Sequence, residues 1–191
     1  MTNPLRTTLA ALLICCVPLA PAGCASSDAS RSASTGGKAG AKKSSGQVGA
    51  PMPSVVVREL NGKRKIDLGA LRGKAVLVDI WASWCAPCME EMPLLDDMAT
   101  RLKKNGVVVI AVSVDEDKES ANTFLGSRPS WSLTVAHDPE GKVPEVLRPA
   151  KMPTSYVLDS EGIIRFVNEG FERGDLAKLE TRLKTLAAEA S

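Results

Sequence analysis

Residues 78–88 decide the fold, and they read Val78-Asp79-Ile80-Trp81-Ala82-Ser83-Trp84-Cys85-Ala86-Pro87-Cys88. The first half of this stretch continues an apolar run that predicts a buried strand over residues 74–81. The second half places Cys85 where that strand gives way to a helix, predicted over residues 85–104 with a kink at Pro93. Two thiols separated by two residues are therefore expected at a strand-to-helix junction.

This thiol pair is better interpreted as a redox-active site than as a structural disulfide. The chain has five cysteines, and the other three, Cys15, Cys16 and Cys24, lie in an N-terminal segment with the character of an export signal. A structural disulfide framework needs several cysteines spread along the chain. A ring that spans two intervening residues also constrains little unfolded-chain entropy. The pair Cys85 and Cys88 is therefore predicted to be redox-active.

Residues 1–24 are predicted to be a signal peptide. The apolar run over residues 9–19 has the length of a signal-peptide core and is shorter than the roughly 20 residues that span a bilayer. Two small residues precede Cys24, as in the bacterial lipoprotein signal, which is cleaved so that the cysteine becomes an acylated N-terminus. Pro21 stands where that signal usually has leucine. Cleavage nearby, with a soluble periplasmic product, is the alternative.

The rest of the chain divides into a linker and one domain. Residues 25–50 are mostly serine, glycine and alanine, which predicts a flexible linker with a reach of about 25–30 Å. That reach would let a tethered domain move along a membrane surface. Residues 51–191 are long enough for a single domain with its own core. A net charge of +2 and 4% aromatic residues give no indication of nucleic-acid binding.

Apolar patterning predicts an α/β domain with a mixed sheet. Asn61-Gly62 between two apolar runs predicts an N-terminal β-hairpin. The further elements expected are strands over residues 107–114, 132–136, 154–158 and 163–167, and helices over residues 117–127 and from a cap at Asp175 to near the C-terminus.

With Glu91-Met92-Pro93 added, the stretch 78–88 resembles the active-site segment of the TlpA/ResA-like branch of the thioredoxin superfamily. The resemblance covers about residues 51–188, including the extra N-terminal hairpin. It implies a thioredoxin fold in which a mixed central sheet is flanked by helices. It also implies an exported, membrane-associated thiol–disulfide oxidoreductase that needs no cofactor beyond its own disulfide. The expected partners are protein disulfides as substrates and a membrane thiol reductant as electron donor.

The two cysteines are expected to have different roles. The sulfur of Cys85 would face the unpaired amides and positive dipole at the start of the helix, which favours the nucleophilic thiolate. Cys88, one turn further on, would stay buried and resolve the mixed disulfide. The intervening residues 86–87 carry no positive charge, and Glu90 and Glu91 are expected in the first helical turn, where they would oppose the thiolate. Both points favour a reductant.

Asp79 is the one charged residue in the otherwise apolar strand, and it lies where thioredoxin carries its buried acid. A carboxyl group buried there would have a raised pKa and could relay the proton of Cys88 through water. The alternative is that Asp79 points to solvent or caps neighbouring backbone.

Two further elements are expected beside the thiols. Met152-Pro153 matches the position of the superfamily's cis-proline loop, which would place the Met152 backbone where an incoming peptide can pair with it. Trp84 is expected to be a partly exposed platform next to Cys85. By contrast, Trp131 is interpreted as a packing residue.

Three functions from different classes are compatible with these residues. The first is an envelope disulfide reductase, monomeric, periplasm-facing and lipid-anchored, with apocytochrome c among its candidate substrates. The second is a Cu(I)-binding module, because a thiol pair can hold Cu(I). His137 is the only histidine that could assist it, and no other metal site is predicted. The third is a thiol peroxidase, whose reactive cysteine would have a different sequence setting.

Overall fold

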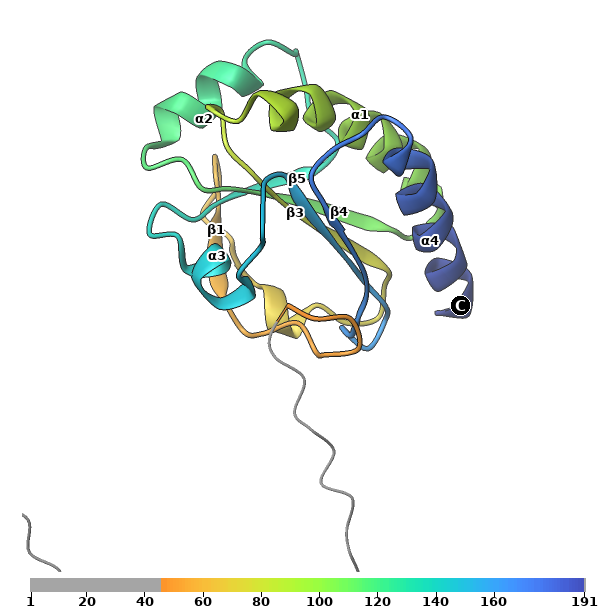
Figure 1. Ribbon diagram of the computed structural model, residues 1–191. Coiled ribbons are helices and arrows are strands. Elements are labelled where there is room, and N and C mark those ends of the chain that lie inside the picture. The colour runs from red at the N-terminus through yellow and green to blue at the C-terminus, as the bar shows by residue number, and fades with distance from the viewer. Residues whose placement is uncertain (1–45, 191) are drawn as a thin grey trace, which may run out of the picture. The chain divides into compact units, whose positions relative to one another are not determined.

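The computed structural model describes residues 46–190, and these form a seven-stranded mixed sheet with helices on both of its faces (Figure 1). The predictions for the signal peptide, for Cys24 and for most of the linker lie outside the described residues.

The sheet has the strand order β2-β1-β5-β4-β3-β6-β7. The strands are β1 (Val56–Glu59), β2 (Lys65–Asp67), β3 (Val76–Trp81), β4 (Val108–Ser113), β5 (Thr134–His137), β6 (Thr154–Leu158) and β7 (Ile164–Glu169). The helices are α1 (Ala86–Leu102), α2 (Lys118–Leu125), α3 (Lys142–Leu147) and α4 (Asp175–Glu189), together with the short 3-10 helices η1 (Leu68–Ala70) and η2 (Lys103–Asn105).

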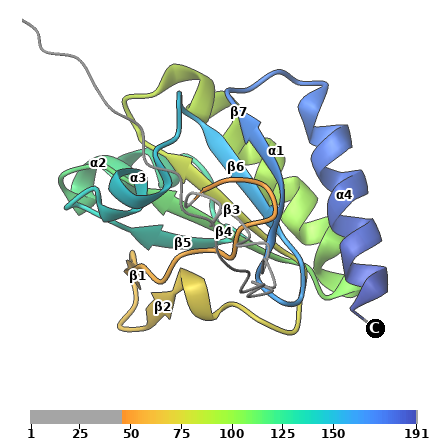
Figure 2. The same ribbon diagram turned by 60° about the horizontal axis from the view of Figure 1, so that its bottom comes forward.

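Strands β3, β4 and β5 are parallel, while β6 and β7 add to β3 as an antiparallel pair. The hairpin of β1 and β2 lies at one edge of the sheet and β7 at the other, as Figure 2 shows. The thioredoxin fold expected from the sequence, with a mixed sheet and an extra N-terminal hairpin, is confirmed. The carboxyl ends of β3 and β4 meet at one edge of the parallel region, and the thiol pair follows β3 there.

The two faces of the sheet have separate cores because side chains alternate along each strand. In β3, Leu77 and Trp81 pack with α1, α2 and α4 in a cluster that also contains both cysteines. Val78 and Ile80 point the other way and pack with α3. The face beneath α1 therefore carries the redox chemistry.

The N-terminal hairpin is present where the sequence predicts it. The Glu59 N–H donates to Arg64 O at 2.9 Å, so residues 60–63, which include Asn61-Gly62, form the loop. Leu60 ties this loop to the sheet, because its side chain is buried and its N–H donates to Val135 O of β5.

The domain begins before residue 51, the boundary expected from composition. Ala50 is buried, its carbonyl accepts the Ile164 N–H at 2.9 Å, and the Gly49 N–H donates to Ile164 O at 2.6 Å. Small residues that look like linker therefore pair with the start of β7.

Two helical details also differ from expectation. Helix α3 is an addition, and its start is fixed by Asp138 Oδ2, which accepts the Val143 N–H at 2.7 Å. Helix α4 begins at Asp175 with Gly174 as its N-cap, whereas the sequence predicts Asp175 itself as the cap.

Candidate active site

The thiol pair occupies the junction that the sequence predicts. Cys85 is the N-cap of α1, makes no side-chain capping hydrogen bond, and is joined to Cys88 by a disulfide of 2.03 Å. The Cys85 N–H donates to Ala82 O at 3.1 Å, which closes the turn out of β3. Pro87 fits the first helical turn because amides there have no intrahelical partner. The Cys85 sulfur therefore lies at the positive end of a 17-residue helix.

The two cysteines differ in accessibility in the way that a nucleophile and a resolving thiol should. Cys85 is 7% exposed and Cys88 is completely buried. Trp84, beside Cys85, is 68% exposed, an unusual position for an indole. The accessible part of Cys85 therefore lies next to an exposed indole that an incoming disulfide can contact.

The loop before β6 contributes the second element of the site. The Met152–Pro153 peptide bond is cis, as the sequence predicts. Ile80 pairs with Thr154, so Pro153 lies beside the end of β3. Met152 is partly buried against the cluster that contains both cysteines.

Asp79 is fully buried, so the solvent-facing alternative is wrong. Its side chain projects to the face beneath α1, because it alternates with Val78 and Ile80 of the opposite core. Ser155 Oγ donates to Asp79 Oδ1 at 2.7 Å, while Asp79 Oδ2 has no hydrogen-bond partner. Burial raises the pKa of Asp79 from 3.8 to about 7, and the Ser155 hydrogen bond lowers it in part. The carboxyl group can therefore gain or lose a proton near neutral pH.

Glu91 differs from the interpretation of the sequence. It lies beyond the first turn of α1, is only 1% exposed, and neither carboxyl oxygen has a hydrogen-bond partner. Burial raises the pKa of Glu91 from 4.5 to about 9, with further increases from the charges of Asp79 and Asp175. Glu91 is therefore mostly protonated at neutral pH, so it does not bring the negative charge expected to oppose the Cys85 thiolate. Glu90, its neighbour, is exposed.

The sequence contains a signal for Glu91 that the first-turn interpretation overlooks. Cys88, Glu91, Met92 and Leu95 follow the i, i+3, i+4, i+7 spacing of a buried helical stripe, and Glu91 is the one acid in it. The same spacing places Glu91 next to Cys88 on the helix surface. Two buried carboxyl groups, from β3 and α1, thus accompany one thiol pair.

The remaining candidate groups lie apart from this chemistry. Residues 46–190 contain no group of three or more histidine, cysteine or acidic side chains arranged to hold a metal ion. His137 is buried, and its Nε2 atom hydrogen-bonds Asp115 O at 2.8 Å. Trp131 packs against Phe124, which confirms its interpretation as a packing residue.

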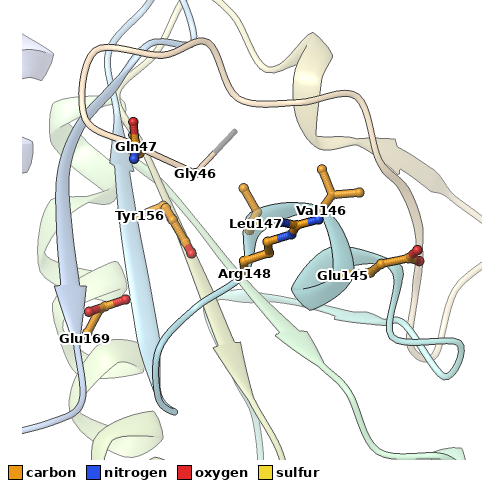
Figure 3. Close-up of a pocket in the computed structure, with 8 residues that line it drawn as sticks. All are labelled: Gly46, Gln47, Glu145, Val146, Leu147, Arg148, Tyr156 and Glu169. Atoms are coloured by element: carbon orange, nitrogen blue, oxygen red, sulfur yellow. The ribbon is translucent and has the colours of Figure 1, made fainter. Parts of the chain in front are cut away.

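A surface hollow of about 600 Å³ lies on the opposite face of the sheet (Figure 3). Tyr156 of β6 points into it, and burial raises the pKa of this phenol to about 12. Arg148, at the end of α3, borders it with a left-handed backbone conformation (φ 52°). None of the residues around the thiol pair lines this hollow, so it takes no part in the dithiol site.

Comparison with known proteins agrees with this geometry. The family model described as Redoxin matches residues 47–183. The chain belongs to the redoxin family. Two relatives are the thiol-disulfide oxidoreductases ResA of Bacillus cereus and Bacillus subtilis. The first is 34% identical over 122 residues (64% of this chain, 69% of the relative), and the second is 33% identical over 122 residues (64% and 67%).

Solved structures of similar proteins extend the comparison. A putative thiol:disulfide interchange protein DsbE from Chlorobium tepidum superposes with a TM-score of 0.68 at 31% identity, over 74% of this chain and 98% of that one. An exposed lipoprotein thioredoxin from Streptococcus pneumoniae gives 0.58 at 25% identity, over 70% and 100%. This redoxin-family protein is a ResA-like thiol–disulfide oxidoreductase of thioredoxin fold.

Proposed function

We propose that this redoxin-family protein is a tethered reductant of disulfides in exported proteins. The observation that carries the proposal is the composition of the site: a thiol pair at a helix N-terminus, no cation between the two cysteines, and two buried acids on the helix and strand behind them. A cation between the cysteines would stabilise the thiolate and make the disulfide more oxidising. Residues 86–87 bring none.

In the proposed reaction, the Cys85 thiolate attacks one sulfur of a substrate disulfide and releases the other sulfur as a thiolate. A mixed disulfide now joins Cys85 to the substrate. Cys88 then loses its proton and attacks the Cys85 sulfur, which releases the second substrate thiolate and leaves the Cys85–Cys88 disulfide. Two electrons pass from the enzyme to the substrate, and the released thiolates take up two protons.

The two buried acids suit the two halves of the cycle. Asp79, with a pKa of about 7, is partly ionised at neutral pH and can accept the proton of Cys88 through water. Glu91, with a pKa of about 9, is protonated and can donate a proton to the Cys88 thiolate that is released when a donor dithiol reduces the enzyme. Different environments thus give two carboxyl groups opposite roles.

We further propose that the protein works in the bacterial envelope, facing the periplasm and anchored through an acylated Cys24. The sequence of residues 1–24 supports this, as does similarity to the pneumococcal exposed lipoprotein thioredoxin. Among residues 46–190, no helix is both long and apolar enough to cross a membrane. A membrane thiol reductant would supply the electrons. Apocytochrome c is a candidate substrate, because its haem-attachment cysteines must be reduced. The enzyme would act as a monomer.

Trapping the mixed disulfide tests this function. Cys88→Ser removes the resolving thiol, so substrates should accumulate on Cys85 in membranes of cells that express the variant, and mass spectrometry would identify them. Cys85→Ser is the matched control and should trap nothing. Recovery of exported cysteine proteins supports the proposal, whereas equal recovery with both variants would refute the assigned nucleophile.

A further inference from the structure

A third buried acid, Asp115, contacts the turn that presents Cys85. Asp115 follows the end of β4, and its side chain accepts hydrogen bonds from Ser83, two residues before Cys85. Asp115 Oδ1 accepts from the Ser83 N–H at 3.1 Å and from Ser83 Oγ at 2.7 Å, and Oδ2 also accepts from the N–H at 3.2 Å. Both the backbone and the side chain of Ser83 are therefore held by one carboxylate.

Two neighbouring residues, Ser113 and His137, hold Asp115 in place. Ser113 Oγ donates to Asp115 Oδ2 at 2.8 Å and accepts the Asp115 N–H at 3.2 Å. On the other side, His137 Nε2 hydrogen-bonds Asp115 O at 2.8 Å. Ser113 and Asp115 are 0% and 1% exposed. The acceptor for Ser83 is thus anchored on two neighbouring parallel strands.

Burying the Asp115 carboxylate costs free energy, so the contacts that compensate for it indicate why the residue lies there. A carboxylate is expensive to remove from water unless it is paired or fully hydrogen-bonded. No lysine or arginine among residues 46–190 forms an ion pair with Asp115. Its partners are neutral donors, and hydrogen bonds to an ionised acceptor are shorter and stronger than neutral ones. The shortest of them, from Ser83 Oγ at 2.7 Å, holds the active-site turn.

We infer that Asp115 is a positioning residue for the thiol–disulfide exchange, which holds the turn over residues 82–85 so that the Cys85 sulfur stays at the N-terminus of α1. The other contacts of this turn are the Cys85 N–H bond to Ala82 O and, in the oxidised protein, the Cys85–Cys88 disulfide, and the Cys85 side chain makes no capping bond. Dipole stabilisation of a thiolate falls off within the first helical turn. A small rotation of Ser83 would therefore change the reactivity of Cys85.

Two substitutions at Asp115 separate the hydrogen bonds from the charge. Asp115→Asn keeps an acceptor for Ser83, and its amide can donate to Ser113 Oγ, so the turn stays in place. Asp115→Ala removes the acceptor and leaves the Ser83 N–H without a partner. Asp117→Ala is the matched control, because Asp117 lies two residues away and its side chain caps the start of α2 through Ser120. It should lower the melting temperature without affecting the turn.

The readout is the pH profile of Cys85 alkylation in the reduced full-length protein, with the modified cysteine located by tandem mass spectrometry. Asp115→Ala should raise the pKa of the Cys85 thiol by about one unit and so slow alkylation about tenfold below that pKa. The disulfide should become correspondingly more reducing, by about 30 mV for a tenfold change in the equilibrium constant. Asp115→Asn and Asp117→Ala should stay within about twofold of the wild type.

Clear results would overturn the assignment. If Asp115→Ala alkylates as fast as Asp117→Ala, the hydrogen bonds to Ser83 do not position Cys85. If Asp115→Asn slows alkylation as much as Asp115→Ala, an acceptor for Ser83 does not preserve the reactivity of Cys85, and the positioning role is wrong. Should Asp115→Ala fail to fold, Ser83→Ala removes the single 2.7 Å hydroxyl bond, and slowing of about two- to threefold is then required; an unchanged rate refutes the inference.

Discussion

Asp79 and Ser155 face each other across strands β3 and β6, and the Ser155 hydroxyl donates a 2.7 Å hydrogen bond to Asp79 Oδ1. Burial raises the pKa of Asp79, and this bond to the ionised form lowers it again, to about 7. The hydrogen bond from Ser155 therefore helps to keep the pKa of buried Asp79 near neutral pH, where the carboxyl group can exchange its proton. Both residues lie on the sheet face that carries the thiols.

The first prediction concerns Asp79 and the pH dependence of stability. The folded protein binds a proton at Asp79 up to about pH 7, whereas the unfolded chain releases it near pH 3.8. Because the folded state binds this proton more tightly, protonation of Asp79 adds its full contribution to the free energy of unfolding below about pH 4. That contribution is lost as pH rises from about 4 to 7. Asp79→Asn should therefore flatten that decline and raise the free energy of unfolding at pH 8 by roughly 2–4 kcal/mol.

Urea unfolding of the oxidised protein at pH 5 and pH 8 measures this effect. Glu90→Gln removes an exposed acid and is the control, because it should leave the decline unchanged. Identical pH dependence in the wild type and Asp79→Asn would show that Asp79 is not protonated in the folded state.

The second prediction tests the role of Ser155. Ser155→Ala removes the hydrogen bond that favours the ionised form, so the pKa of Asp79 should rise further. A hydrogen bond to a charged group contributes about 1.5–3 kcal/mol, which corresponds to about one pKa unit or more. The ¹³C chemical shift of the Asp79 carboxyl group, followed by NMR across pH, reports the midpoint directly. Ser155→Thr keeps the hydroxyl and should titrate like the wild type; a lower midpoint in Ser155→Ala would contradict the assignment.

The third prediction concerns the anchor. If Cys24 is acylated, the mature protein partitions with membranes, and Cys24→Ser abolishes processing or releases the protein. Cys16→Ser, within the cleaved segment, should have no effect on partitioning. Mass spectrometry of the mature N-terminus decides the question. An unacylated terminus at another residue would show that Pro21 is incompatible with the lipoprotein signal.

Local sequence signals predict the parts of the site that lie close together in the chain. The strand, the turn with Cys85 and the start of α1 are contiguous, and the buried position of Asp79 follows from its apolar neighbours. The cis peptide bond at Pro153 follows from a resemblance at a single dipeptide. In each case one short stretch contains the whole signal.

Other parts depend on contacts between distant segments. Glu91 is expected with Glu90 in the first helical turn, and the helical phase of Glu91 relative to Cys88 is the one local sign of its burial. The conformation of the hairpin loop depends on Leu60 reaching the core, and the network around Asp115 joins Ser83 and Asp115, which are 32 positions apart. The hairpin loop and the Asp115 network can be predicted only once the packing of the sheet is known.

The fourth prediction concerns the redox potential. Because residues 86–87 are uncharged, the potential of the Cys85–Cys88 pair should lie closer to the thioredoxin value of about −270 mV than to the strongly oxidising value of about −120 mV. Pro87→His places an ionisable ring between the cysteines, stabilises the thiolate and should make the potential less negative. Equilibration with glutathione buffers measures both proteins. A wild-type potential above about −180 mV would contradict a reductant.

The last prediction concerns Glu91 as a proton donor. When a donor dithiol reduces the enzyme, it attacks Cys85 and releases Cys88 as a thiolate, which needs a proton. Glu91 lies next to Cys88 on α1, is buried, and keeps its proton up to about pH 9. Glu91→Gln cannot supply that proton, so reduction at pH 7 should slow about tenfold. This effect is smaller than typical general acid catalysis, because a thiolate leaves without needing a proton in the transition state as strongly as an alkoxide or amine does.

Stopped-flow reduction by dithiothreitol across pH measures the rates of the wild type and Glu91→Gln. Their ratio cancels the ionisation of dithiothreitol, so it should be about ten at pH 7 and fall towards one above pH 9, where Glu91 has lost its own proton. Glu90→Gln, one residue earlier and exposed, should match the wild type at every pH. A ratio of one throughout, with the fold of the variant intact, would leave Glu91 as a buried acid without a part in proton transfer.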